Sequence, residues 1–116
     1  MIPTRLVTGA SGAAREAAIA ARLLPGEATA VILEGLPDGN PLLIPSTSLR
    51  LARIAPGCLC CTGNLVLRVT LNRILRQRPS RLYLGVANAG HLDQLRSWLA
   101  SAPYDQLLEL GADLGA

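Results

Sequence analysis

All three cysteines of this chain lie within four positions, in the segment Gly57-Cys58-Leu59-Cys60-Cys61-Thr62. Thiolates are the ligands that zinc, cobalt and cuprous copper favour. Cys60 and Cys61 come just before a predicted helix, whose N-terminal dipole stabilises the thiolate form of a cysteine. Three thiolates leave one tetrahedral position open for water, a carboxylate or a transfer partner. We therefore predict that Cys58, Cys60 and Cys61 bind one soft divalent metal ion.

The same cysteines allow two other interpretations, a redox-active thiol pair and a set of small packed side chains. An odd number of cysteines at adjacent positions argues against a disulfide framework. His91, Glu34 and Asp38 are candidates for a fourth metal ligand. A single histidine after a turn is also typical of a cap or a surface residue, so the fourth ligand stays open.

A second candidate site follows the first predicted strand, where the layout of strand, glycine-containing turn and helix is that of a phosphate-binding P-loop. The P-loop motif is G-x-x-x-x-G-K-[ST]. Gly9 fits its first glycine, and we take Gly9, Gly12 and Arg15 as the candidate nucleotide contacts. The alternative is an ordinary strand-to-helix turn that happens to contain glycine.

Three residues of this loop depart from the motif, and each departure has a chemical consequence. Ala14 adds a Cβ where the backbone must approach a phosphate. Arg15 keeps the positive charge of the missing lysine but is bulkier and forked, and the chain contains no lysine at all. Glu16 places a negative charge where the magnesium-binding hydroxyl would stand. We expect binding of GTP and magnesium at this loop to be lost.

These residues need a scaffold, and the sequence pattern predicts alternating strands and helices. Apolar runs favour strands over residues 5–8 (with Ile2 as an extension), 28–33, 42–44, 49–54, 81–86 and 105–110. Alanine content or helical spacing of apolar residues favours helices over 13–24, from about 62 or 63 to 77, and 92–100. Residues 111–116 are expected to be a frayed tail. Such alternation is typical of a parallel sheet, whose ligands bind at the carboxyl ends of the strands.

Composition excludes several classes of protein. Half of the 116 residues are apolar, which is typical of a globular chain. No apolar run has the length of a membrane span, and the first residues lack the layout of a signal peptide, so we expect a cytoplasmic protein. Arginines cluster between positions 68 and 81. With one tryptophan and two tyrosines available for stacking, a solvated helix face is favoured over a nucleic-acid surface.

Taken together, these motifs resemble those of the CobW-type GTPases, a metal-chaperone family related to the GTPases that insert metal into urease and hydrogenase. Gly57-Cys58-Leu59-Cys60-Cys61-Thr62 matches the family motif G-C-x-C-C-T. The segment Arg78-Pro79-Ser80-Arg81-Leu82-Tyr83-Leu84 is similar to R-P-D-R-L-L-I. The segment Gly85-Val86-Ala87-Asn88-Ala89-Gly90-His91-Leu92 is similar to E-P-S-G-L-G-H-P. The resemblance implies a P-loop NTPase-like three-layer α/β sandwich with a mostly parallel sheet, here truncated, and a role in delivering zinc or cobalt.

The departures from the family pattern fall on the nucleotide chemistry. Besides the altered loop, Gly85 replaces an acidic residue expected to organise magnesium, and Asn88 replaces a glycine expected to sense the terminal phosphate. The chain also ends before the guanine-reading N-K-x-D motif and the C-terminal domain. Residues 1–116 are thus expected to form a single CobW-like domain that is a degenerate relative of these metallochaperones.

The resulting hypothesis is a metal-binding protein without GTPase activity that holds zinc or cobalt through Cys58, Cys60 and Cys61. Its partners would be the metal ion and a second copy, a full-length relative or a metalloenzyme client, with neither membrane nor nucleic acid. Two alternatives stay open. The first is a weakly active GTP-binding and hydrolysing metallochaperone that uses Arg15 and Glu16, and the second is a structural interaction module.

Overall fold

A computed structural model describes residues 1–24, 26–35, 43–54, 65–87, 90 and 92–115. Its sheet consists of β1 (Ile2–Thr8), β2 (Thr29–Glu34), β3 (Leu49–Ile54), β4 (Arg81–Gly85), β5 (Leu108–Leu110) and β6 (Leu114–Gly115). The helices are α1 (Gly12–Ala20), α2 (Leu65–Leu75) and α3 (Leu92–Leu99), with a 3₁₀ turn, η2 (Tyr104–Gln106). Among the described residues, no helix has the length and apolar character needed to cross a bilayer.

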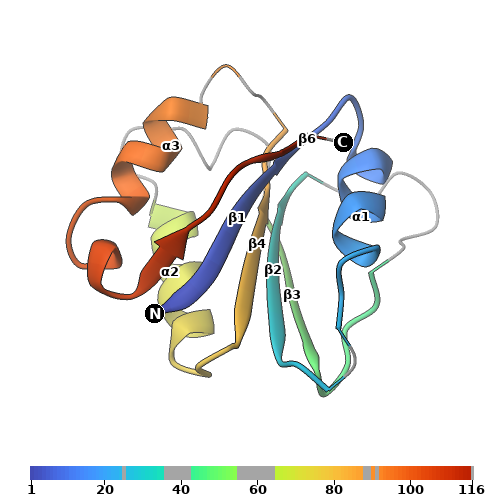
Figure 1. Cartoon of the computed structure of the whole chain (residues 1–116), viewed down its shortest axis with the longest axis horizontal. Coiled ribbons are helices and arrows are strands. Elements are labelled where there is room, and N and C mark those ends of the chain that lie inside the picture. Colours follow the sequence, from blue (N-terminus) through green and yellow to red (C-terminus); the bar gives the residue numbers. More distant parts are fainter. Residues whose placement is uncertain (25, 36–42, 55–64, 88–89, 91, 116) are drawn as a thin grey trace.

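The strand order is β3-β2-β4-β1-β5, and every strand pair is parallel. β6 continues the edge beyond β5 and also pairs with β1. Helix α1 covers one face of the sheet, and α2 and α3 cover the other (Figure 1). This arrangement confirms the predicted α/β sandwich with a parallel sheet. Because all strands run in one direction, β1, β2, β3 and β4 end at the same edge of the sheet.

Two apolar cores explain why the strands are so apolar. One core lies between the sheet and α2 and α3 and contains Leu6, Ile32, Leu67, Leu71 and Leu84. The other lies on the α1 face and includes Val7, Ile19, Val31 and Tyr83. Strand β2 is buried along its whole length, as its run of apolar residues predicts. Packing on both faces thus fixes the register of the central strands.

Several predicted boundaries were wrong. Helix α1 ends at Ala20, not at Leu24, because the amides of Arg22 and Leu23 bond to carbonyls only three residues back and tighten the chain. Leu43 is buried, yet neither it nor Ile44 lies in a strand, and Leu42 is outside the described residues. The strand predicted over 105–110 is shortened to β5 by the preceding turn η2.

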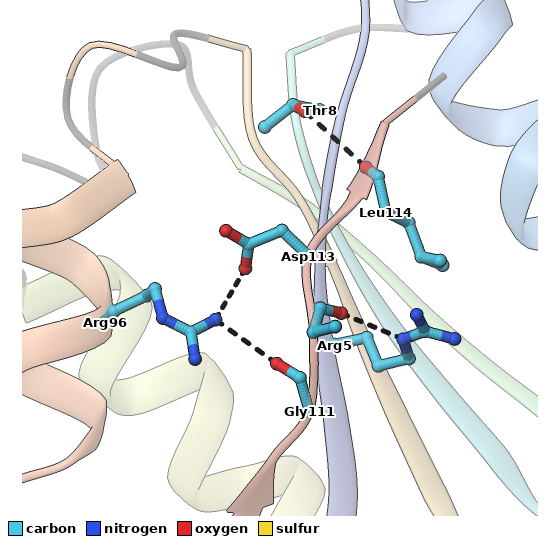
Figure 2. Close-up of polar contacts among 7 residues, drawn as sticks. Arg5, Thr8, Arg96, Gly111, Asp113 and Leu114 are labelled. Atoms are coloured by element: carbon cyan, nitrogen blue, oxygen red, sulfur yellow. Dashed lines mark hydrogen bonds and ion pairs between the residues drawn. The ribbon is translucent and has the colours of Figure 1, made fainter.

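The C-terminal segment is not frayed, in contrast to the prediction. Strand β6 pairs with Val7 and Thr8 of β1. Side chains from two other elements hold the residues between β5 and β6 (Figure 2). Arg96 of α3 donates to the carbonyl of Gly111 at 3.2 Å and pairs with the Asp113 carboxylate at 2.5 Å. Nε of Arg5 in β1 donates to the carbonyl of Ala112 at 3.0 Å. These long-range contacts order a segment whose own sequence gives little strand signal.

Candidate functional site at the carboxyl edge of the sheet

The carboxyl ends of β1, β2, β3 and β4 lie at one edge of the sheet, and each strand precedes a predicted site segment in the sequence. The Gly9 turn follows β1, Glu34 ends β2, and the cysteine-bearing segment connects β3 to α2. Cys58, Cys60, Cys61, Asp38, Asn88 and His91 all lie outside the described residues. Within the part of the chain that the structure describes, no group of three or more His, Cys, Asp or Glu side chains is arranged to hold a metal ion.

The turn after β1 is closed by its own helix cap. Ser11 is the N-cap of α1, and its hydroxyl accepts a hydrogen bond from the amide of Ala14 at 3.0 Å. The carbonyl of Ser11 accepts from the amide of Arg15 at 3.1 Å. A P-loop binds phosphate with backbone N–H groups at the start of its helix. Here the Ser11 hydroxyl satisfies one of those amides, that of Ala14, whereas the Arg15 amide makes the first ordinary hydrogen bond of the helix.

Arg15 turns back onto this loop. Its side chain is largely buried, with the residue only 8% exposed, and its Nη1 donates to the carbonyl of Gly9 at 3.0 Å. Gly12 and Arg15 also line the same small cavity. The structure therefore brings together the three residues predicted to contact nucleotide, Gly9, Gly12 and Arg15. The arginine that would have to contact a phosphate instead donates to the loop.

Glu16 is buried beside Arg15 and forms an ion pair that the sequence did not reveal. Its Oε1 contacts Nη2 of Arg53, the residue before the last position of β3. Glu16 is 3% exposed, and the Arg53 side chain is 20% exposed. A charged residue inside a predicted strand was the available signal for Arg53. Because Glu16 is neutralised within the protein, it acts as a structural anchor between α1 and β3.

Glu34 and Gly85 complete this edge. A carboxylate oxygen of Glu34 accepts a hydrogen bond from the amide of Ala87 at 2.8 Å, which ties the end of β2 to the end of β4. Gly85 lies beside Leu33 in the β2–β4 register, and a Cβ at position 85 would stand 2.7 Å from Cδ2 of Leu33. The residue that replaces the expected acidic group therefore allows close packing of β4 against the Leu33 side chain.

The charged residues of this edge enclose little space. We refer to Arg15, Glu16, Glu34 and Arg53 as the carboxyl-edge cluster. The cavity that it shares with Gly12, Leu33 and Gly35 has a volume of about 10 Å³. One water molecule needs a volume of that order. Two guanidinium groups and two carboxylates thus lie together, with space between them for about one water molecule.

Fold and site together define an α/β protein with a parallel sheet, compatible with a truncated P-loop NTPase-like sandwich, in which the Arg15 side chain bonds to the turn after β1. No protein-family model and no solved structure matches the chain. The chain is similar to the zinc chaperone YeiR of Escherichia coli strain K12, with 32% identity over an alignment of 120 residues that covers 98% of this chain. It spans 37% of the length of that relative. The similarity confirms the resemblance carried by the sequence motifs: the chain is a relative of the CobW-type metallochaperones.

Proposed function

We propose that this chain binds zinc as cargo through the thiolates of Cys58, Cys60 and Cys61, with cobalt as the alternative ion, and handles that metal without hydrolysing GTP. The observation that carries the proposal is the similarity to a zinc chaperone over nearly the whole chain, together with three cysteines in a G-C-x-C-C-T motif. Three thiolates suit a soft divalent ion and leave one coordination position for exchange with a partner.

The contacts of the carboxyl-edge cluster support the absence of GTP hydrolysis. Phosphoryl transfer requires positive charge positioned against the phosphates and a bound magnesium ion. Arg15 donates to the Gly9 carbonyl, and Glu16 is paired with Arg53. Neither side chain is presented to a phosphate in this arrangement. The proposed protein is therefore a metal-binding domain whose release of metal depends on a partner and not on a nucleotide.

The proposal also includes the setting in which the metal is used. We expect residues 1–116 to act as one CobW-like domain in the cytoplasm, where cysteines stay reduced and able to bind metal. The open coordination position would be completed by a second copy of the chain, a full-length relative or a metalloenzyme client. Glu34, Asp38 and His91 remain the candidates within this chain for a fourth ligand.

Metal content after purification under reducing conditions tests the proposal. We expect about one zinc ion per chain or per dimer in the unaltered protein. The variant Cys58→Ser, Cys60→Ser, Cys61→Ser should lose the metal. A matched variant with three substitutions in another loop, Ser46→Ala, Thr47→Ala and Ser48→Ala, should keep it. Cobalt added to the metal-free protein should give a thiolate-to-cobalt charge-transfer absorption that the cysteine variant lacks.

Two outcomes would overturn the proposal. In the first, the unaltered protein is isolated free of metal and refuses both added zinc and added cobalt. In the second, metal content is the same in the cysteine variant and in the unaltered protein. A disulfide found by mass spectrometry in a protein that refuses metal would favour the redox interpretation. Unchanged partner binding in the cysteine variant, with no metal in either protein, would favour a structural interaction module.

A further inference from the structure

Among the described residues, strand β3 forms one edge of the sheet, and part of its backbone has no hydrogen-bond partner there. The amide of Gly35 donates to the carbonyl of Ile54, and the amide of Thr29 donates to the carbonyl of Ser48. In a parallel ladder this places the polar groups of Arg50, Ala52 and Ile54 toward β2 and those of the alternate residues outward.

The outward N–H and C=O groups of Leu49 both bond to the backbone of Ser46. The amide of Ser46 donates to the carbonyl of Leu49 at 3.0 Å, and the amide of Leu49 donates to the carbonyl of Ser46 at 3.3 Å. The outward N–H and C=O groups of Leu51 and Arg53 have no hydrogen-bond partner within the described residues. Two residues spaced by one therefore offer two donors and two acceptors along the same side of β3. Such an edge is a template for an additional strand.

A groove of about 250 Å³ runs beside this edge, between β3 and α2. Among the described residues, its apolar lining comes from both elements, and its charged lining residues are arginines. The lining residues are Pro45, Arg50, Leu51, Ala52, Thr70, Arg73, Ile74 and Gln77. An extended chain paired with β3 would place every second side chain on the α2 side of the sheet, next to Arg50 and Arg73.

The basic charge of the groove is uncompensated. No acidic residue occurs between positions 65 and 80, a segment that contains four arginines. Arg50 and Arg73 are exposed, and neither forms an ion pair within the described residues. A second copy added across this edge by a two-fold axis would bring its own Arg50 and Arg73 to the interface, which like-charge repulsion disfavours.

We propose that the β3 edge and its groove bind an extended acidic segment of another protein as an added strand. Main-chain bonds to Leu51 and Arg53 would supply affinity, and carboxylates facing Arg50 and Arg73 would supply specificity, as in other cases of strand addition. None of the described residues that line this surface is a cysteine, and we expect the interaction not to require bound metal. The proposed partner is therefore a protein with an acidic segment that can adopt an extended conformation.

The test uses a fluorescein-labelled peptide of about eight residues in which valine alternates with glutamate, a length typical of a strand. Binding to the full chain is followed by fluorescence anisotropy. We expect Arg73→Glu and Arg50→Glu each to weaken binding by about tenfold, because a like charge then faces each carboxylate. Arg76→Glu is the matched control, since Arg76 lies on the same helix, is exposed, and does not line the groove.

Peptide variants separate strand addition from charge attraction. A peptide with lysine in place of glutamate should not bind, and N-methylation of alternate amides should abolish binding in one of the two registers. The cysteine-to-serine variant should bind the acidic peptide as well as the unaltered chain does. The proposal is overturned if no saturable binding occurs, if Arg76→Glu weakens binding as much as Arg73→Glu, or if neither N-methylated register loses affinity.

Discussion

Glu16 of α1 and Arg53 of β3 form an ion pair that joins helix α1 to the edge strand of the sheet. The Glu16 side chain is 5% exposed and that of Arg53 is 20% exposed. In sequence, the cysteine-bearing segment follows β3. The ion pair therefore fixes the carboxyl end of β3, the last described part of the chain before the cysteines.

Removing one member of this pair should be costly. Glu16→Gln leaves the Arg53 guanidinium without its carboxylate. We expect the free energy of unfolding, measured in urea, to fall by about 2–4 kcal/mol, because a largely buried charge loses its partner. The double variant Glu16→Gln, Arg53→Gln should recover part of that loss. The more exposed pair Glu27–Arg81, whose side chains are 35% and 38% exposed, is the control, and Glu27→Gln should have a much smaller effect. Equal losses in Glu16→Gln and Glu27→Gln would contradict the assignment.

Nucleotide should not stabilise the protein. A ligand at a concentration 100 times its dissociation constant stabilises the folded state by about 2.7 kcal/mol. Stabilisation of that size raises the melting temperature measurably. Since Arg15 donates to Gly9 and the cavity is small, we expect no shift with millimolar GTP and magnesium. Arg22→Ala is the control, because Arg22 is an exposed arginine just after α1. The prediction is contradicted by a magnesium-dependent rise in melting temperature that Arg15→Ala abolishes and Arg22→Ala leaves intact.

Gly85 and Gly111 offer a matched pair for testing close packing. A Cβ at position 85 would stand 2.7 Å from Cδ2 of the buried Leu33, whereas one at position 111 would meet Cγ of Arg5 at 3.5 Å. We expect Gly85→Ala to destabilise the protein by about 1–3 kcal/mol through overpacking. Gly111→Ala should change stability by less than about 0.5 kcal/mol. Chemical denaturation measures both changes. The double variant Gly85→Ala, Leu33→Ala should lose less stability than the sum of the losses in the two single variants.

Tyr104 should make stability fall at high pH. Burial raises the pKa of its phenol, and the nearby Arg68 opposes that rise. The folded state then keeps the proton after the unfolded chain, whose tyrosine pKa is about 10, has lost it. The free energy of unfolding should therefore decline as the pH rises above about 10. Tyr104→Phe should reduce that decline in urea unfolding, although it also removes the hydrogen bond to Asn72.

Arg68→Gln supplies the complementary measurement. Because Arg68 lowers the pKa of Tyr104, its removal should raise that pKa further. Absorbance titration in a Tyr83→Phe background follows Tyr104 as the single tyrosine of the chain. A lower phenol pKa in Arg68→Gln would mean that the arginine does not act on Tyr104 as described.

Local patterns predicted most of the fold because burial on both faces leaves strong signals. The apolar runs at β2 and β4 and the spacing of Leu67, Leu71 and Ile74 in α2 are such signals. Strand β6 was missed because its order depends on Arg5 and Arg96, which are distant in sequence. Leu43 misled the prediction because it is buried without belonging to a strand.

The candidate site was only partly predictable for a similar reason. The convergence of Gly9, Gly12 and Arg15 follows from the strand-turn-helix layout, and the structure reproduces it. The partner of Glu16 could not be inferred, because no local rule links residue 16 to residue 53. The role of Gly85 depends equally on a neighbour, Leu33, on another strand. The assignment of the three cysteines to metal stays a prediction.

The two edges of the sheet differ in a way that limits assembly. On the β5 and β6 side the strands have three and two residues, and Arg5 and Arg96 bind the carbonyls between them. Short, interrupted edges resist the addition of further strands. A sheet that grows from both sides can polymerise into filaments, whereas one that accepts a strand on a single side stops after one addition. Within the described residues, this domain therefore offers one side for strand addition, so its sheets would not join one after another into fibres.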